Sequence, residues 1–252
     1  MNATDLLAAW DAQQVAFIEM RTLRTRCLTD VLAARQAELG RELRVLDLGC
    51  GPGSLGQAVL AAIPEARVVG LDRDPVLLRL GRETNPDPER LSTFDVDLRD
   101  PDWPTHLDGA TFDAAISATA LHWLEPGELA RLYQSVASVL TPQGICLNAD
   151  HLLFDALAHP WMRRLATDER ERVRVKLTTA GALTWQEWWD AALAHPGWEA
   201  EAAEYARRWS DKAPTTKVSA EFHLEAMRAA GFVEAAQIWQ WFDDRVLYGR
   251  LG

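Results

Sequence analysis

The stretch Val45-Leu46-Asp47-Leu48-Gly49-Cys50-Gly51-Pro52-Gly53-Ser54-Leu55-Gly56 decides the fold. An apolar run typical of a buried strand leads into glycines at alternate positions, and these lead into a helical pattern. Glycines let the backbone turn tightly and approach a ligand without side chains in the way. The stretch therefore predicts a strand, a glycine-rich loop and a helix, with a flat or extended ligand docked on the loop.

The sequence around this stretch, between Leu43 and Leu251, alternates short β-rich runs with helical patterns. This alternation is typical of a mostly parallel sheet covered on both faces. The last two strands are joined by Asp243 and Asp244, which favour turns, and this predicts an antiparallel hairpin at the sheet edge. The predicted class is α/β, a Rossmann-like sheet of seven strands at Leu43–Leu48, Arg67–Leu71, Leu91–Val96, Phe112–Ser117, Gly144–Ala149, Phe232–Trp241 and Arg245–Tyr248.

Two helical regions flank the predicted core. Apolar residues recur at helical spacing from Asp5 to about Leu39, and Gly40 follows them as a C-cap would. Residues 151–220 break the alternation and are helical and rich in tryptophan, which predicts a helical insertion that covers the carboxyl edge of the sheet as a lid. The chain is thus predicted to be one domain, with N-terminal helices (1–40), a ligand-binding core (41–150), the lid insertion (151–220) and a last helix with edge strands (221–252).

Composition and net charge limit the classes of partner that the chain is expected to bind. The 252 residues include 37 acidic and 26 basic ones, for a formal charge of −11, and no basic run could follow a phosphate backbone. Nucleic acid and membrane are therefore not expected as partners, and a small molecule is. No segment approaches the ~20 apolar residues needed to span a bilayer, and the first residues are polar, so a cytoplasmic location is expected. Cys27, Cys50 and Cys146 are expected to be reduced thiols, and the chain is expected to be a monomer or a homodimer.

The glycine loop allows two interpretations. Gly51, Gly53 and Gly56 satisfy the dinucleotide pattern G-x-G-x-x-G, with Asp72 near the expected ribose-binding position. An NAD-dependent oxidoreductase is therefore an alternative.

Three observations favour a cationic ligand without phosphate. The Asp47 carboxylate at the strand end is unfavourable beside a pyrophosphate and favourable beside an ammonium or sulfonium. Pro52 removes one N–H that a phosphate cradle would use. Asp97, just past the third strand, adds a carboxylate that can accept a hydrogen bond from an adenine amino group.

Residues Asp47 to Gly53 resemble the first motif of class I S-adenosylmethionine-dependent methyltransferases. The resemblance extends from Leu43 to Ala149 and to the closing Ala229-Ala230-Gly231-Phe232. It implies that Asp72 holds the ribose hydroxyls of S-adenosylmethionine and that Asp97, with the Leu98 backbone, meets the adenine. The full set of residues assigned to this cofactor is Arg21, Asp47, Gly49, Cys50, Gly51, Gly53, Asp72, Arg73, Asp97, Leu98 and Ser117.

Within that superfamily, two stretches are similar to the trans-aconitate methyltransferase type, whose members act on small acids. One is Phe112 to Trp123, which ends in His-Trp; the other is Phe17-Ile18-Glu19-Met20-Arg21-Thr22. By this likeness Arg21 would clamp the methionine carboxylate. The chain lacks the proline that follows the Arg-Thr-Arg run in that type, and nothing after His151 matches it, so the acceptor is not carried over.

His122 is the candidate catalytic residue. An imidazole can exchange protons near neutral pH, so this residue could act as general base on a hydroxyl or carboxyl acceptor, although a histidine beside a tryptophan is also a common packing residue. A carboxylate acceptor would need no base. The predicted acceptor contacts are His122, Trp123, His151 and Trp185, although the tryptophans of the insertion could equally form its own core.

The sequence lacks the motifs that would indicate two other classes of methyltransferase. The segment Ser117-Ala118-Thr119-Ala120 is not the Asn/Asp-Pro-Pro-aromatic motif of nucleic-acid amino-methyltransferases. The acids of a metal-assisted catechol-type site do not occur in order, so no metal is predicted. A methyltransferase-like protein that binds the cofactor without catalysis remains an alternative.

Overall fold

The computed structural model describes residues 1–18, 20–210 and 215–252, and within these one seven-stranded sheet organises the molecule. The strand order is β3-β2-β1-β4-β5-β7-β6, and β7 runs antiparallel to both of its neighbours. The predicted α/β class and the antiparallel C-terminal hairpin are confirmed. The strands are β1 Leu43–Leu48, β2 Ala66–Asp72, β3 Leu91–Asp95, β4 Phe112–Ala118, β5 Leu140–His151, β6 Phe232–Trp241 and β7 Asp244–Leu251.

The structure corrects several predicted strand bounds: β5 continues to His151 and β7 to Leu251, beyond the predicted Ala149 and Tyr248, and the other strands shift by about one residue or less. β5 begins at Leu140 rather than Gly144, because its first residue already pairs with Phe112 of β4. The hairpin turns at Phe242 and Asp243, whereas Asp244 was expected in the turn and is already paired with Trp241. Phe242 takes the positive φ of the turn, 49°, and the buried ion pair of Asp244 with Arg24 holds Asp244 in the strand.

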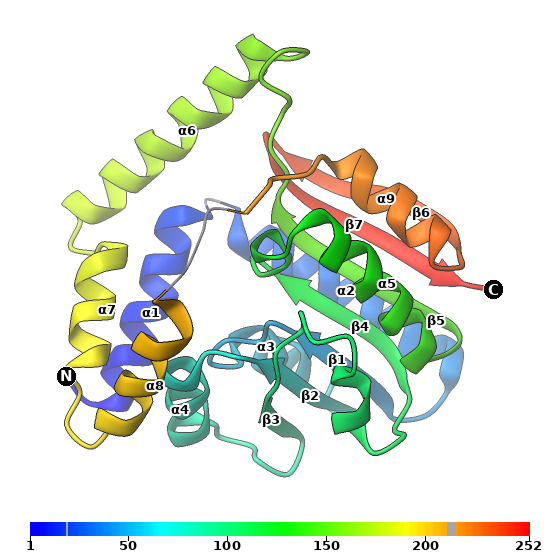
Figure 1. Cartoon of the computed structure of the whole chain (residues 1–252), viewed down its shortest axis with the longest axis horizontal. Helices are drawn as coiled ribbons and strands as arrows, with labels where there is room; N and C mark the ends of the chain where they lie inside the picture. Colours follow the sequence, from blue (N-terminus) through cyan, green and yellow to red (C-terminus); the bar gives the residue numbers. More distant parts are fainter. Residues whose placement is uncertain (19, 211–214) are drawn as a thin grey trace.

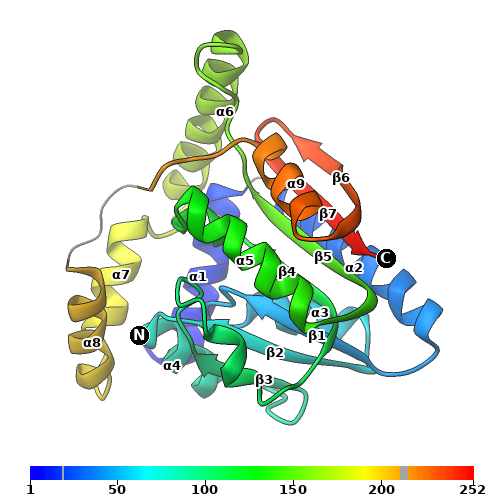
Figure 2. The same ribbon diagram turned by 45° about the vertical axis from the view of Figure 1, so that its right-hand side comes forward.

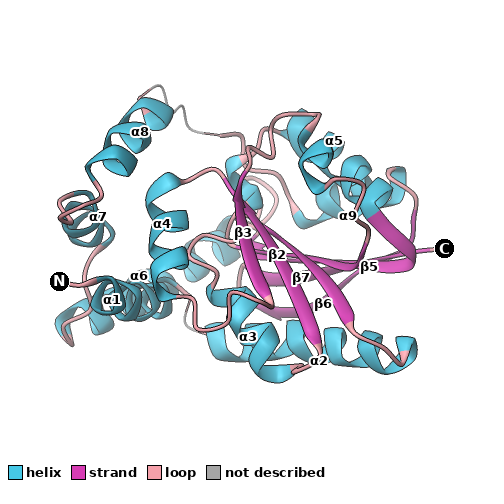
Figure 3. Ribbon diagram, turned by 90° about the horizontal axis from the view of Figure 1, so that it is seen from below, coloured by secondary structure: helices cyan, strands magenta, loops and turns pink. Residues whose placement is uncertain are grey.

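Helices cover both faces of the sheet, as the alternating pattern predicted. Figure 3 shows α2 and α3 on one face and α5 and α9 on the other. Leu28 and Leu32 of α2 and Val59 of α3 share one apolar cluster with the strands, whereas Tyr133 of α5 and Met227 of α9 belong to the other. The bounds are α1 Ala3–Phe17, α2 Arg21–Leu39, α3 Ser54–Ala62, α4 Pro75–Thr84, α5 Pro126–Val139, α6 Pro160–Thr179, α7 Trp185–Leu193, α8 Glu199–Trp209 and α9 Ala220–Ala229, with 3₁₀ turns η1 Trp103–Leu107 and η2 Leu121–Trp123.

The predicted N-terminal helical region forms two helices. Asn2 caps α1 by accepting a hydrogen bond from the Asp5 amide at 2.8 Å. Gly40 ends α2 with a left-handed φ of 62°, and its N–H donates to the carbonyl of Gln36. The C-cap expected at Gly40 is therefore confirmed.

The insertion forms α6, α7 and α8, which with α1 make a helical layer beside the sheet. Its core contains Leu6 and Trp10 of α1, Leu80 of α4 and the buried Trp188 and Trp189 of α7. In Figure 1, α1, α7 and α8 lie on the side toward which β4 points, and α6 stands away from the body there and in Figure 2. A lid over the carboxyl edge remains a prediction, and residues 211–214 of that segment lie outside the described residues. No helix in the described part of the chain is long and apolar enough to span a membrane.

Trp188 is expected to be essential for the stability of this helical layer. Its side chain is fully buried and its indole N–H donates to the Leu6 carbonyl at 3.0 Å, so it fixes α7 on α1. Trp188→Ala is expected to lower the free energy of unfolding by about 3–5 kcal/mol in urea titrations, because it leaves a large cavity. The matched control is Trp161→Ala, since Trp161 is 63% exposed and its removal should cost about 0.5 kcal/mol or less. Equal losses for the two variants would contradict this packing role.

Candidate active site

The glycine loop leaves β1 and passes directly under the residues that follow β4. Gly49 has a φ of +71°, and a Cβ there would lie 2.4 Å from the Cβ of Ala120, so a side chain has no room. The Gly49 and Cys50 amides both donate to the carbonyl of Leu71, at 2.8 and 3.1 Å. The loop is therefore fixed between the ends of β2 and β4, with Gly53 entering α3 at a φ of +87°.

Asp47 is the most unusual group of this loop. Its side chain is 1% exposed, and its Oδ2 atom accepts no hydrogen bond within the described part of the chain. Burial, and then repulsion from Asp72, raises the pKa of Asp47 to about 7. A buried acceptor oxygen without a partner is costly, and a cationic donor placed on it would remove that cost.

Asp72 supports the loop from the end of β2. Its Oδ2 accepts the Gly51 amide at 2.7 Å, and its Oδ1 accepts the Asp74 amide at 2.8 Å. Burial raises the pKa of Asp72 in spite of these backbone hydrogen bonds. The structure thus brings Asp47 and Asp72 together at the loop, as predicted, whereas ribose binding by Asp72 stays a prediction.

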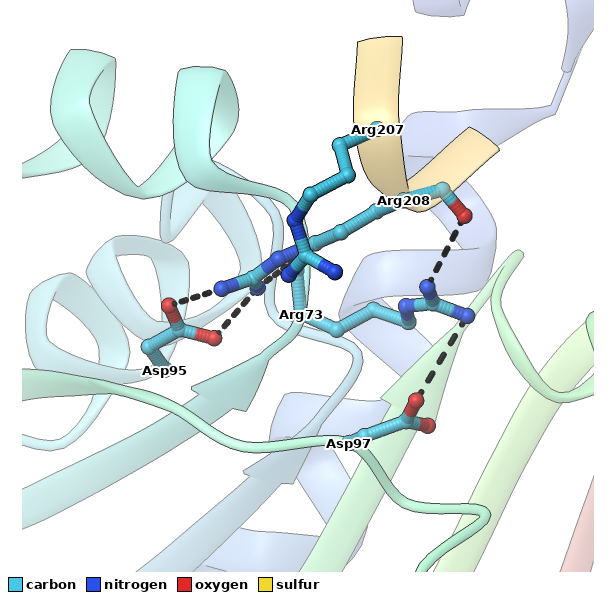
Figure 4. Close-up of a pocket in the computed structure, with 5 residues that line it drawn as sticks. All are labelled: Arg73, Asp95, Asp97, Arg207 and Arg208. Carbon is cyan, nitrogen blue, oxygen red and sulfur yellow. Dashed lines mark hydrogen bonds and ion pairs between the residues drawn. The ribbon is translucent and has the colours of Figure 1, made fainter. Parts of the chain in front are cut away.

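A cavity of about 360 Å³ lies beyond β2 and β3, lined by Arg73, Asp95, Asp97, Arg207 and Arg208. Figure 4 shows Arg208 of α8 reaching across to Asp95, with N···O distances of 2.6 and 2.8 Å. In the same view Arg73 lies between the Arg208 carbonyl, 3.1 Å from its Nη2, and Asp97, 3.5 Å from its Nη1. The predicted cofactor residues Arg73 and Asp97 therefore share one cavity with arginines of the insertion that the sequence did not single out.

Asp97 is tied to its own loop by Arg99. Both carboxylate oxygens accept from the Arg99 guanidinium, at 2.6 to 3.2 Å. Burial opposes ionisation, but these hydrogen bonds keep the pKa of Asp97 below its usual value. Asp97 is thus an ionised acceptor at the rim of the cavity.

Three other predicted cofactor residues serve the scaffold. The Ser117 hydroxyl donates to the Leu48 carbonyl at 2.7 Å and joins β4 to β1. Cys50 is buried, with its sulfur against Gly70, where a Cβ would lie 2.7 Å away. Leu98 is partly buried against the apolar cluster under α5.

The predicted carboxylate clamp, Arg21, lies at the start of α2 and pairs with Asp11 of α1 at 2.8 Å. Arg24, one turn later and 3% exposed, points to the sheet instead. Its guanidinium donates to Asp244 of β7 at 2.9 Å and to the Thr119 hydroxyl at 2.8 Å. Because Thr119 directly follows β4, Arg24 is the arginine of α2 that reaches the carboxyl edge. Glu19, part of the motif that suggested Arg21, lies outside the described residues, as does the Phe17 side chain.

His122 pairs with Asp150, a residue that the sequence did not single out for this role. Nδ1 of His122 lies 2.8 and 3.0 Å from the two Asp150 oxygens, and the His122 amide donates to Oδ2 at 3.2 Å. Asp150 is fully buried near the end of β5. Although burial acts to raise it, the interaction with His122 brings the pKa of Asp150 well below its usual range. Parallel pairing of β4 with β5 places the two residues together, which the strand order could have indicated.

The remaining predicted acceptor contacts divide between two places. The Trp123 ring lies 4.9 Å from the His122 ring and 6.4 Å from the Trp209 ring, so it lies beside the pair formed by His122 and Asp150. His151 lies 3.3 Å from Asp243, and burial lowers its pKa. Trp185 packs on Trp10 and Trp189 at the surface of the helical layer and is 42% exposed.

Residues 1–18, 20–210 and 215–252 hold no group of three or more His, Cys, Asp or Glu side chains arranged to bind a metal ion.

Comparison with known proteins agrees with this geometry. Residues 45–144 match the family model described as a methyltransferase domain. The trans-aconitate 2-methyltransferase of Methylobacterium nodulans is 32% identical over 177 residues, 69% of this chain and 62% of that protein. The enzyme of the same name from an Azoarcus species is 32% identical over 168 residues, 64% of this chain and 61% of that protein. The chain thus spans about three fifths of the length of these curated relatives.

The chain belongs to the class I S-adenosylmethionine-dependent methyltransferase family. Solved structures agree at the level of the fold: the S-adenosylmethionine-dependent methyltransferase SibL in its apo form has a TM-score of 0.52 at 21% identity, covering 89% of this chain and 55% of that one. Human N-acetylserotonin methyltransferase, solved in complex with SAM, has a TM-score of 0.53 at 15% identity, covering 100% of this chain and 60% of that one. The family and the likeness to the trans-aconitate type, both predicted from sequence motifs, are confirmed.

The two arginines of α2 give a matched test of the site's framework. Arg24→Met is expected to lower the free energy of unfolding by about 3–5 kcal/mol, because it leaves buried Asp244 without its partner. Arg21→Met should cost about 1 kcal/mol or less, because the Arg21 side chain is 24% exposed and Asp11 42%. Chemical denaturation of both variants measures the difference, and the double variant Arg24→Met/Asp244→Asn should recover part of the loss. Similar losses of unfolding free energy in the two single variants would contradict the role of Arg24 in neutralising the buried Asp244 carboxylate.

Proposed function

We propose that this chain binds S-adenosylmethionine and transfers its methyl group to an oxygen of a small-molecule acceptor, a carboxylate or a hydroxyl. The observation that carries the proposal is the buried Asp47 carboxylate, which has an unpartnered oxygen beside a backbone loop without room for side chains. An amino acid ammonium supplies the missing donor and charge, and the sulfonium adds a second positive group. A pyrophosphate would bring more negative charge to Asp47 and Asp72, and this disfavours the dinucleotide alternative.

The residues that would hold the cofactor come from three strand ends and from α2. Asp47 and the loop backbone from Gly49 to Gly53 would bind the methionine end, and Arg24 is better placed than Arg21 to meet its carboxylate. Asp72 and the cavity at Arg73 and Asp97 would hold the ribose and adenine. When bound, the cofactor supplies an electrophilic methyl group, which needs alignment and exclusion of water more than it needs protein chemistry.

The acceptor is proposed to bind at the carboxyl ends of β4 and β5, beside His122 and Trp123. The curated relatives named trans-aconitate 2-methyltransferase support a carboxylate acceptor, and the pairing of His122 with Asp150 supports a hydroxyl. His122 is the proposed general base for a hydroxyl acceptor. His151, at the end of β5, is a further proposed contact, whereas the packing of Trp185 gives no support for its contact with the acceptor.

Calorimetric titration with S-adenosylmethionine and with NAD tests the cofactor. Asp47→Asn is expected to weaken S-adenosylmethionine binding about 10- to 100-fold, because it removes a charge-assisted hydrogen bond. The matched control is Asp108→Asn, at an exposed left-handed position that asparagine tolerates, and it should bind as the unaltered chain does. Binding of NAD without binding of S-adenosylmethionine would overturn the proposal.

The pH dependence follows from the raised pKa of Asp47, about 7. A cation binds the ionised carboxylate better, so S-adenosylmethionine affinity should fall as pH falls from 8 to 6. The stability of the free chain depends on pH in the opposite direction. Because folding raises the pKa of Asp47, the free energy of unfolding should fall as pH rises from about 4 to about 7. Asp47→Asn should reduce both dependences, measured by calorimetry and by denaturation across this pH range; a flat affinity profile in the unaltered chain would contradict the assignment.

A further inference from the structure

Helix α6 buries little of its surface within one chain. Of its 20 residues, only Ala166 and Val173 are buried. Figures 1 and 2 show α6 standing away from the body of the molecule. Packing of an apolar face supplies most of the stability of a protein helix, so the outer face of α6 is a candidate contact surface.

The inner face of α6 is the one attached to the body. Ala166, Arg170 and Val173 line a small cavity beside the β6–β7 hairpin, and Arg170 pairs with Asp243 of that hairpin. On a helix these three residues lie roughly 120–180° around the axis from Trp161. Trp161 therefore marks a face that points away from the hairpin.

The outer face carries a coiled-coil repeat. Its large apolar residues Trp161, Leu165 and Val175 are 63%, 36% and 48% exposed. Asp168 and Arg172 occupy the same face between Leu165 and Val175 and are also exposed. The intervals along the face are thus four, three, four and three residues, which is the heptad spacing by which two helices pack side by side.

Two opposite charges at the centre of this repeat determine the direction of a partner helix. A parallel copy of α6 would place Asp168 against Asp168 and Arg172 against Arg172, which is unfavourable. An antiparallel copy places each Asp168 opposite Arg172 of the other chain. Arg172 pairs with Glu169 of its own helix at 2.6 Å, and its side chain is still 56% exposed, so it can meet a second carboxylate.

The antiparallel register that pairs these charges also satisfies the rest of the repeat. With Asp168 opposite Arg172 of the second copy, Leu165 lies opposite Val175, and Trp161 lies opposite Thr179, the last residue of α6. Two-fold rotation produces each of these contacts twice, as a self-complementary interface requires. The apolar contacts and the ion pairs therefore occur together in one arrangement.

We propose that a second copy of this chain docks on the outer face of α6 and forms an antiparallel two-fold dimer. The face consists of Trp161, Leu165, Asp168, Arg172, Val175 and Thr179. A monomer and a homodimer were both compatible with the sequence, and this surface favours the dimer. The proposal does not depend on the proposed function.

The dimer is expected to be weak. One helix from each chain is a small contact compared with standard interfaces of about 800 Å² per partner, so we expect a Kd on the order of 10 µM. Unfolding titrations at about 1 µM then measure the monomer, and Trp161→Ala remains a suitable control for Trp188→Ala.

Sedimentation velocity of the full chain, from about 1 to about 300 µM, tests the dimer. The mass should double across this range. Asp168→Arg and Arg172→Asp each place like charges opposite one another in the dimer and should raise Kd at least about 10-fold. The matched control is Asp30→Arg on α2, because Asp30 forms an exposed pair with Arg26 at the same four-residue spacing, 3.5 Å apart, and this variant should dimerise as the unaltered chain does.

A mixture of the two single variants tests the register. When Asp168→Arg and Arg172→Asp are mixed, each acidic position of one chain faces a basic position of the other, so the two should associate about as tightly as the unaltered chain. The double variant Asp168→Arg/Arg172→Asp restores the opposite charges within one chain and should dimerise again. An effect of the substitutions on α6 alone would not be reversed by mixing.

Three results would overturn the proposal: a monomer at about 300 µM, a dimer whose Kd is the same in both single variants, or a mixture that does not associate. Binding of the monomeric chain to phosphatidylglycerol vesicles would assign the face to an anionic membrane and would likewise overturn it. None of these results bears on cofactor binding or methyl transfer, so the proposed function is tested separately.

Discussion

The burial of carboxylates behind bare backbone at one edge of the sheet is the constraint on which the site depends. Asp47 is almost completely inaccessible and Asp72 lies beside it, so each makes ionisation of the other less favourable. Asp72 is compensated by the backbone amides of Gly51 and Asp74, and Gly51 takes the left-handed φ of +54° that the loop requires there. One oxygen of Asp47 accepts no hydrogen bond within the described residues. Such a buried group is favourable where a bound cation supplies the missing interaction.

The loop that carries this arrangement is held from both sides. Leu71 at the end of β2 accepts two of its amides, and Ala120 beyond β4 presses on Gly49. The same turn beyond β4 carries His122, whose ring is fixed by Asp150 on β5. The glycine loop and the histidine–aspartate pair are therefore parts of one rigid edge, because the parallel strands β1, β4 and β5 lie side by side.

Local sequence determined most of what could be predicted. The strand, loop and helix around Gly49 follow from a short continuous pattern, and parallel strands bring their carboxyl ends to one edge, so Asp47 and Asp72 were expected together. The strand bounds failed where pairing partners decide them, as at Leu140 and Asp244. Arg21 was assigned through the likeness of Phe17 to Thr22 to the trans-aconitate type, and such a motif does not give the rotation of α2 against the sheet. One turn of α2 separates Arg21, which pairs with Asp11, from Arg24, which is buried beside β7.

Contacts between distant segments account for what the sequence did not show. Arg208 is 113 residues from Asp95 and 135 from the Arg73 carbonyl that it also binds, so no local pattern could place them in one cavity. The same holds for the helical layer, where Trp188 of α7 bonds to Leu6 near the other end of the chain. The proposed cofactor-binding residues lie mainly on the regular sheet and its loops, whereas the acceptor site that we propose is assembled from α2, η2, β5 and the segment that leads into α9. A short motif therefore identifies the site that we propose for the methyl donor. The residues proposed around the acceptor share no short stretch of sequence, so they have to be inferred from charge and geometry.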